Sequence, residues 1–342
     1  MAQGFHMFQD EIDITPGTIG SWVNVDVSAN VPSGASGAVL HFIGQASSSL
    51  GGDVRANGST DDHYAQGGLQ AEVHRYNFVK LDANRIFQAK IGDTNVKLYL
   101  VGYTDGNVQF QTNVTDVTSA TAGAWTDKDL SAYIPSGASA VIIKFINTLA
   151  LYNYQCAARK PTSTDAFQNE MYVNTYSPAS IICGVSGTRH IELYMQDITN
   201  TKAYLVGYLL PLTSMFTNAI DKTPITTAAW VDVDVSSIVS TDAVAVILNL
   251  TRPASGTFAN GVRAKDSTQN LNKSLTPNTY TGAVVKLNAA KLFQSYVADT
   301  NSHVRVVGYC YPERMSPPHA NLIGLSASPV MDNAKFEMAT LG

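Results

Sequence analysis

The chain repeats itself three times, and this repetition constrains its fold more than any other feature. The tryptophans set the period, because Trp22, Trp125 and Trp230 are separated by 125 − 22 = 103 and 230 − 125 = 105 residues. They open the similar phrases WVNVDVS, WTDKDLS and WVDVDVS. A fixed period of this kind indicates that one structural unit is used repeatedly.

Three further landmarks follow each tryptophan in the same order. An arginine precedes Ser-Thr by four residues, an aspartate opens a D-T-N or D-I-T-N turn, and Val-Gly-Tyr ends the unit. The arginines are Arg55, Arg159 and Arg263, and the aspartates are Asp93, Asp197 and Asp299. We therefore predict domains at 8–106, 107–211 and 212–312, with joins so short that neighbouring domains touch.

The units have the pattern of β-strands. Their apolar runs AVLHFIG, AVIIKFIN and AVAVILNL are short, rich in β-branched residues and bounded by turn residues, and VKLYLVGY alternates as a closing strand does. Roughly seven or eight such strands in each unit favour a β-sandwich or a jelly roll, and the choice stays open. The best candidates for helical turns are LDANRIFQ and LNAAKLFQ. We predict an all-β protein of three tandem sandwich or jelly-roll-like domains plus an extended C-terminal arm.

Composition excludes several partner classes. Only 14% of the residues are charged and the formal net charge is −5, with no dense basic run, which argues against binding to nucleic acid. No stretch approaches the length of about 18 apolar residues that spans a membrane. The first residues lack the pattern of a signal peptide, and three cysteines (Cys156, Cys183 and Cys310) show no metal-binding spacing. We expect free thiols and synthesis in a reducing cytosol.

The repeated residues have alternative interpretations. The tryptophans suit a ligand-stacking platform or, as we favour, a structural anchor. The arginines with their Ser-Thr partners suit anion or sugar binding or, as we favour, the pinning of a loop to a carboxylate within each domain. Asp26, Asp129 and Asp234 suit a calcium site or, as we favour, carboxylates that bind backbone donors at strand ends.

Catalysis has little support in the sequence. The histidines do not recur at equivalent positions, and the chain contains no nucleophile elbow, HExxH motif, P-loop or dinucleotide fingerprint. We therefore predict that the chain is not an enzyme and needs no cofactor or metal.

The last thirty residues, 313–342, share no landmark with the repeats. Prolines interrupt them, yet Leu322, Ile323, Leu325 and Phe336 make the segment too apolar for a solvated tail. We predict an arm that packs on a neighbouring subunit or on its own third domain.

The phrases W-x-D-V-D-[VL]-S, [VI]-P-S-G-A, R-x-x-x-S-T and V-G-Y together resemble a β-sandwich repeat of structural proteins in tailed bacteriophages. The resemblance covers the three units, roughly nine-tenths of the chain, with short motifs of moderate specificity. It implies a virion structural protein made in the host cytoplasm, of the capsid decoration (cement), head-fibre or tail type. Its partners would be the major capsid protein or neighbouring copies.

Two functional expectations follow. The first is a capsid decoration protein that stabilises the head surface. The second is a tail-fibre or receptor-binding component that recognises host-surface glycan through loops around Tyr64, Tyr152, Tyr154 and Tyr280. An enzyme acting on polysaccharide is a distant third.

Overall fold

The computed structural model is almost entirely made of β-strands. It describes residues 3–45, 51–63, 73–149, 154–170, 172–173, 178–252, 258–271, 273–275 and 279–312. The one helix in these ranges is a 3-10 turn, η1 (Phe167–Glu170). The all-β prediction is confirmed. The predicted arm at 313–342, with Leu322, Ile323, Leu325 and Phe336, lies outside the described residues, as do Tyr64 and Tyr152.

The strands fall into three successive groups. The first group contains β1 (Phe5–Asp13), β2 (Val23–Asp26), β3 (Gly37–Gly44), β4 (Gly52–Ala56), β5 (His74–Lys80), β6 (Ile86–Ile91) and β7 (Val96–Thr104). The second contains β8 (Val108–Asp116), β9 (Trp125–Asp129), β10 (Ala140–Asn147), β11 (Tyr154–Arg159), β12 (Tyr172–Val173), β13 (Ala179–Gly184), β14 (His190–Met195) and β15 (Thr201–Leu209). The third contains β16 (Thr213–Asp221), β17 (Trp230–Asp234), β18 (Ala245–Arg252), β19 (Phe258–Ala264), β20 (Lys273–Leu275), β21 (Thr279–Lys286), β22 (Leu292–Val297) and β23 (His303–Cys310). The first strand thus begins ahead of residue 8, and the groups meet at 105–107 and 210–212.

Each group forms two antiparallel sheets. In the third domain the inner sheet has the order β16-β23-β18-β21 and the outer sheet β17-β22-β19-β20. Counted one to eight along the domain, these orders are 1-8-3-6 and 2-7-4-5, which is a jelly roll. The equivalent inner sheets are β8-β15-β10-β13 and β1-β7-β3-β5. Strand order therefore decides the choice that the sequence pattern left open.

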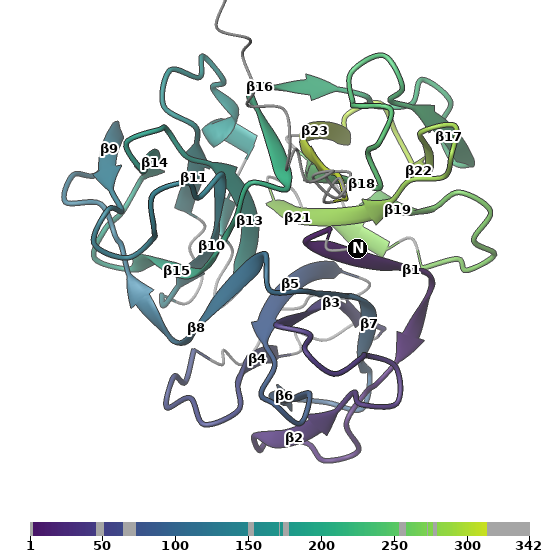
Figure 1. Ribbon diagram of the computed structural model, residues 1–342, viewed down its shortest axis with the longest axis horizontal. Helices are drawn as coiled ribbons and strands as arrows, with labels where there is room; N and C mark the ends of the chain where they lie inside the picture. The colour runs from purple at the N-terminus through teal and green to yellow at the C-terminus, as the bar shows by residue number, and fades with distance from the viewer. Residues whose placement is uncertain are drawn as a thin grey trace, which may run out of the picture.

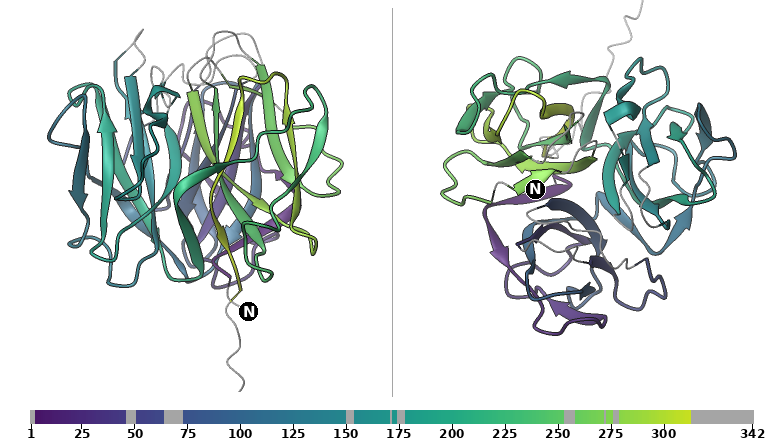
Figure 2. Two further views of the ribbon diagram at one scale, coloured as in Figure 1. Left: turned by 90° about the horizontal axis from the view of Figure 1, so that it is seen from above. Right: turned by 180° about the vertical axis from the view of Figure 1, so that it is seen from behind.

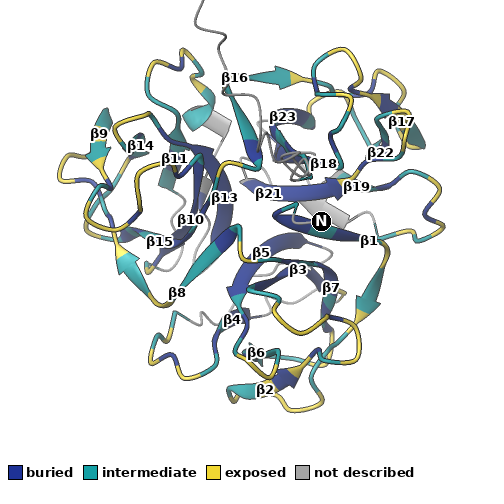
Figure 3. Ribbon diagram, in the orientation of Figure 1, coloured by how far each residue is buried: buried dark blue, intermediate teal, exposed yellow. Residues whose placement is uncertain are grey.

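The three domains surround a common centre (Figure 1). The equivalent strands β5, β13 and β21 contact one another there. These central strands are buried, whereas the edge strands β2, β9 and β17 lie at the rim with exposed residues (Figure 3). The N-terminus and the joins between domains lie at one end of the ring (Figure 2), since Phe5 pairs with Thr104. Three jelly rolls in one chain thus form a pseudo-threefold ring.

The closing Val-Gly-Tyr motif forms a β-bulge that directs a valine toward the neighbouring domain. At Gly102 the register of β7 shifts against both β1 and β3, and a Cβ there would lie 2.5 Å from the backbone oxygen of His6. Glycine is required because the strands approach this closely. The bulge turns Val101 toward the neighbouring domain, and Val206 and Val307 occupy the equivalent places.

The predicted helical turns are wrong. LDANRIFQ forms a turn followed by β6, in which Arg85 has a φ of 64° and the Asp82 side chain accepts hydrogen bonds from the amides of Asn84 and Ile86. Lys291 has a φ of 61° in LNAAKLFQ, which leads into β22. Positive φ at this position ends any helical path, and the Asx side chain stabilises the turn instead.

Candidate functional site

The three domains meet at three interfaces (Figure 1), and the repeated arginines Arg55, Arg159 and Arg263 each line a cleft at one of them. We call these interfaces the first seam (first and second domains), the second seam (second and third domains) and the closing seam (third and first domains). Each encloses a small cleft, with about 450, 370 and 420 Å³ of empty space respectively. Because the clefts occupy equivalent positions, their differences can be compared residue by residue.

Each repeated arginine lies over the repeated tryptophan of its own domain. The guanidinium carbon is 4.4 Å from the ring centre of Trp22, 4.0 Å from that of Trp125 and 4.2 Å from that of Trp230. A guanidinium at this distance is attracted to the π-face of an indole. One face of each tryptophan is thus occupied by an arginine of the same domain, so that face is not available to stack on a ligand.

The same arginines hold a loop in place. Their Nη1 atoms donate to the backbone oxygens of Asp61, Asp165 and Gln269. Among the described residues, the expected carboxylate partner is found for Arg159 alone, whose Nε lies 2.6 Å from Glu192. The other two donate Nε to glutamines, Gln88 and Gln294. None of these partners is Asp93, Asp197 or Asp299.

The loop held by the arginine forms a latch to the next domain. In the first seam, Ser59 Oγ donates to Asn113 Oδ1 at 2.9 Å and the amide of Thr60 donates to the same oxygen at 3.0 Å. Asp61 Oδ2 then accepts from the amide of Val114 at 2.7 Å. The second seam repeats this latch with Ser163, Thr164 and Asp165 against Asn218 and Ala219. The Ser-Thr landmark therefore joins domains.

In the closing latch the carboxylate and the side-chain amide have changed places: the carboxylate lies on the strand and the amide in the loop. Ser267 Oγ donates to Asp10 Oδ1 at 2.6 Å, so a carboxylate stands where the other latches have asparagine. Gln269 replaces the aspartate of the loop. Its Oε1 accepts from the backbone amide of Glu11, and its Nε2 donates to the backbone oxygen of Glu11. This latch closes the chain of domains into a ring.

The seams differ most at one buried position of the inner sheet, occupied by His41, Lys144 and Asn249. In the first seam, Lys144 Nζ donates to both carboxylate oxygens of Asp53 at 2.7 and 2.8 Å. These side chains are only 8% and 2% exposed. This ion pair joins the second domain to the first.

Among the residues that the structure describes, the second seam has no such ion pair. Asn249 replaces the lysine, Ala157 stands where the first domain has Asp53, and Asn249 Oδ1 has no hydrogen-bond partner among the described residues. A cation–π contact lies nearby, in which the guanidinium carbon of Arg305 is 4.0 Å from the ring centre of Phe167. The equivalent pair in the first seam is His63 stacked on Tyr204 at 4.3 Å.

The closing seam contains two buried histidines. His41 Nδ1 lies 2.7 Å from Glu11 Oε2, and its Nε2 lies 2.9 Å from His74 Nδ1. His74 Nε2 continues to Asn260 Oδ1 of the third domain at 2.7 Å. The three equivalent positions therefore carry an imidazole chain, an ion pair and a neutral amide.

The other repeated aspartates bind their own turns. Asp26, Asp129 and Asp234 accept from the amides two residues ahead, at Ser28, Ser131 and Ser236, as expected of strand-end carboxylates. Asp93 and Asp197 do the same for Asn95 and Thr199, while Asp299 accepts from Arg252 at 2.7 Å. These contacts stabilise turns. In the described part of the chain, no three His, Cys, Asp or Glu side chains gather as metal ligands would.

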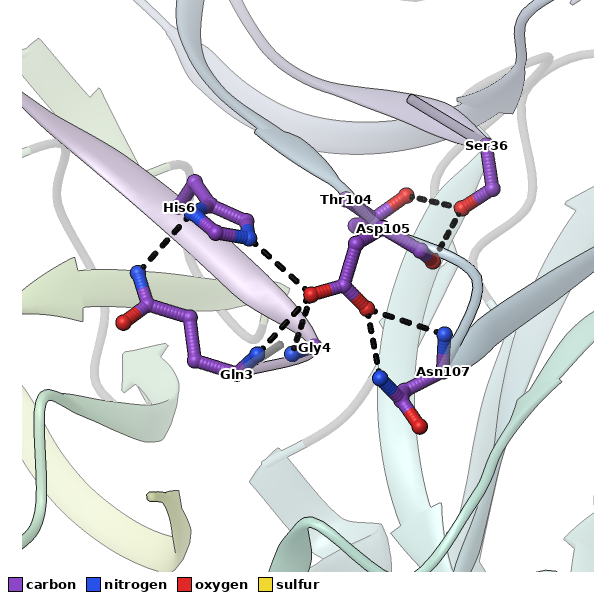
Figure 4. A network of polar contacts seen from close by, with 7 residues as sticks. All are labelled: Gln3, Gly4, His6, Ser36, Thr104, Asp105 and Asn107. Carbon is purple, nitrogen blue, oxygen red and sulfur yellow. Dashed lines mark hydrogen bonds and ion pairs between the residues drawn. The ribbon is translucent and has the colours of Figure 1, made fainter. Parts of the chain in front are cut away.

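A further carboxylate anchors the start of the chain. Asp105, in the join after β7, accepts from the amides of Gln3 and Gly4, from His6 Nε2 and from the amide of Asn107 (Figure 4). Burial acts to raise the pKa of Asp105, but the hydrogen bonds led by that of His6 outweigh it and hold the pKa well below its usual range. Leu210 and Tyr311 occupy the equivalent places, so only the first join has this anchor.

The cysteines are free and buried. Burial raises the pKa of Cys156 and of Cys310 to about 12, and raises that of Cys183 as well. Thiols of this kind are poor nucleophiles and metal ligands.

The residues proposed for glycan contact are not brought together. Tyr280 is 2% exposed on β21, so its prediction as a surface contact is wrong. Tyr154 lies in β11, and the other two tyrosines fall outside the described residues. The reasoning from sequence also missed the strand side of the latches. Their spacing was the available signal, since Asp10, Asn113 and Asn218 are separated by 113 − 10 = 103 and 218 − 113 = 105 residues.

Comparisons with known proteins add little. No family model matches the chain, and no curated protein matches its sequence. One solved structure, described as "The Triple Jelly Roll Fold and Turret Assembly in an Archaeal Virus", is 8% identical over 91% of this chain and 89% of that chain, with a TM-score of 0.24. A likeness this loose carries no argument. Within the described residues, no helix has the length and apolar character needed to cross a membrane.

Proposed function

We propose that the chain is a non-enzymatic virion structural protein that decorates the capsid surface and stabilises it. The observation that carries this proposal is the ring, in which three jelly rolls of one chain are closed head to tail by a repeated latch. Such a ring presents pseudo-threefold symmetry from a single polypeptide, which suits a threefold or quasi-threefold position on a symmetric shell.

Two features support this proposal. The repeated residues are engaged in seams and turns, which is the use expected of a scaffold rather than of three active sites. The end of the ring that carries the N-terminus also carries the two joins between domains, at 105–107 and 210–212, so neither join lies at the opposite end (Figure 2). The partner would be the major capsid protein or neighbouring copies of this chain.

A binding assay tests the proposal. Purified full-length protein should bind expanded capsids of the same virus and raise their melting temperature. Protein truncated after Pro312 should bind more weakly, because the apolar segment that follows would be lost. If neither protein binds capsids while the full-length chain adheres to host cells, the decoration proposal fails and a tail component is favoured.

Copy number provides an independent test. Quantitative mass spectrometry of purified virions should find on the order of a hundred or more copies if the chain occupies repeated positions on a shell. About a dozen copies or fewer would contradict decoration of the shell and favour the tail.

A further inference from the structure

We propose that the Glu11–His41–His74–Asn260 chain makes the closing seam sensitive to pH, so that mild acid opens the ring between the third and first domains. The first and second seams stay closed under the same conditions. The proposal concerns the ring itself and does not depend on what the ring decorates.

The chain of contacts begins and ends on the third domain. Gln269 of that domain holds the backbone of Glu11, whose carboxylate binds His41. His41 binds His74, and His74 binds Asn260, again on the third domain. His41 and His74 are 1% and 0% exposed, so in the closed seam their hydrogen bonds are made within the protein rather than with bulk water. The contacts therefore couple the protonation of two imidazoles to the fit between two domains.

Only one hydrogen fits between His41 Nε2 and His74 Nδ1, which are 2.9 Å apart. With both imidazoles neutral, the hydrogen bonds run toward the Glu11 carboxylate. This arrangement requires the Asn260 amide to turn its Nδ2 toward His74, where the structure has Oδ1. One added proton makes His41 an imidazolium, which still donates from Nδ1 to Glu11. The other two bonds reverse, so that His41 Nε2–H donates to His74 Nδ1 and His74 Nε2–H donates to Asn260 Oδ1. A second added proton would set two N–H groups against each other, so the closed seam holds at most one.

The sign of the pH effect follows from this count. An open seam exposes both imidazoles to water. An exposed imidazole ordinarily has a pKa near 6.5, so below that pH the open seam holds two added protons, one on each ring. The closed seam holds fewer protons, so its stability is present above that value and is lost as the pH falls. Each unit of pH then weakens closure by about tenfold, the effect of one proton.

The groups that surround the imidazoles do not compete for these protons. Tyr76 stacks on His41 at 4.3 Å and Tyr99 lies 6.5 Å from it, each measured between ring centres. Burial, aided by nearby carboxylates, raises the pKa of both tyrosines, so they remain neutral. From the third domain, the neutral Asn260 contacts His74, and the neutral Thr281 hydroxyl accepts from the backbone amide of Tyr76. These tyrosines and third-domain groups therefore stay neutral in the range where an ordinary imidazole takes up a proton.

The other seams lack such a chain among the described residues. The first seam contains His63, but burial and the neighbouring Lys144 lower its pKa, so it takes up a proton at a lower pH than an ordinary imidazole. The second seam has Asn249 and the Arg305–Phe167 contact at the corresponding places. The closing seam should therefore open first.

Hydrogen exchange on the full chain tests the proposal. Between pH 7.5 and 5, and after correction for intrinsic rates, peptides from β1 and β19 should lose protection by about tenfold per unit below pH 6.5, while those from β8 and β16 keep theirs. His74→Gln should flatten this dependence. His190→Gln changes an imidazole that binds Asp127 on an outer sheet, so it should behave as the wild type.

Three outcomes would overturn the proposal. They are loss of protection in all seams together, full protection of β1 down to pH 5, or an unchanged profile in His74→Gln. If that variant does not fold, NMR of the wild type decides. The Hε1 signals of His41 and His74 should follow a single shared step that coincides with exchange in β1, and two independent titrations contradict the proposal.

Discussion

The first and second seams share one latch and differ in what they bury behind it. Both join Ser-Thr of one domain to an asparagine on the first strand of the next, with hydrogen bonds of nearly equal length. Behind the latch the first seam buries the Lys144–Asp53 ion pair, whereas the second has the buried residues Asn249 and Ala157 at the equivalent positions. The repeated residues therefore determine how the domains dock, and the residues that are not repeated determine how strongly each seam depends on charge.

Breaking the ion pair should give the largest effect. Asp53→Ala leaves the buried Lys144 ammonium without its carboxylate, which should reduce the free energy of unfolding by about 3–5 kcal/mol. Urea denaturation followed by fluorescence measures the change. The matched control is Asp53→Ala with Lys144→Asn, which copies the second seam and should recover most of the loss. A double variant as unstable as the single one would contradict our account of the seam.

Removing the latch should cost less and should cost the same in both seams. Asn113→Ala and Asn218→Ala each remove an oxygen that accepts two hydrogen bonds, for an expected loss of about 1–2 kcal/mol. Parallel urea titrations would measure both. A difference larger than about 1 kcal/mol between them would show that the latches are not equivalent.

Replacing the stacked arginine should have a smaller effect that distinguishes the domains. Lysine cannot keep both the stack on tryptophan and the fork of hydrogen bonds, so Arg55→Lys should cost about 0.5–1 kcal/mol. Arg159→Lys should cost somewhat more, because Arg159 also loses its contact with the Glu192 carboxylate. Equal losses in thermal unfolding would mean that this carboxylate contributes nothing.

The anchor at Asp105 should have the smallest effect on unfolding, because it holds only the start of the chain. Since its pKa is lowered, its contribution is complete above the usual carboxyl range and is lost as the pH falls below about 4. Asp105→Asn should speed exchange of the Gln3 and Gly4 amides at neutral pH and leave β8 and β16 unchanged. Unaltered exchange of those two amides would rule out the anchor.

The sequence was sufficient for what is local and periodic. The spacing of the tryptophans predicted the triplication, and the apolar runs predicted strands such as β3, β10 and β18. The sequence pattern did not predict how strands distant in the sequence pair, because the jelly-roll order depends on contacts that no periodicity encodes.

The latch shows where the reasoning from sequence stopped. The Ser-Thr landmark was found, but it was assigned to the inside of each domain, since a spacing does not say whether a partner is in the same repeat or the next. Asn249 and Ala157 were not singled out at all. These two residues become informative only when the domains are superimposed, because they then occupy the positions of Lys144 and Asp53.

The short joins of the ring have a consequence for how the chain could be rewired. The three residues 105–107 connect the end of β7 to the start of β8, and 210–212 do the same for β15 and β16. By pseudo-symmetry a linker of similar length should connect Cys310 to Phe5, because these residues occupy the equivalent strand ends. A circular permutant that is joined there and reopened at either existing join should keep every latch. The same ring could therefore be formed with any of three orders of the domains along the chain.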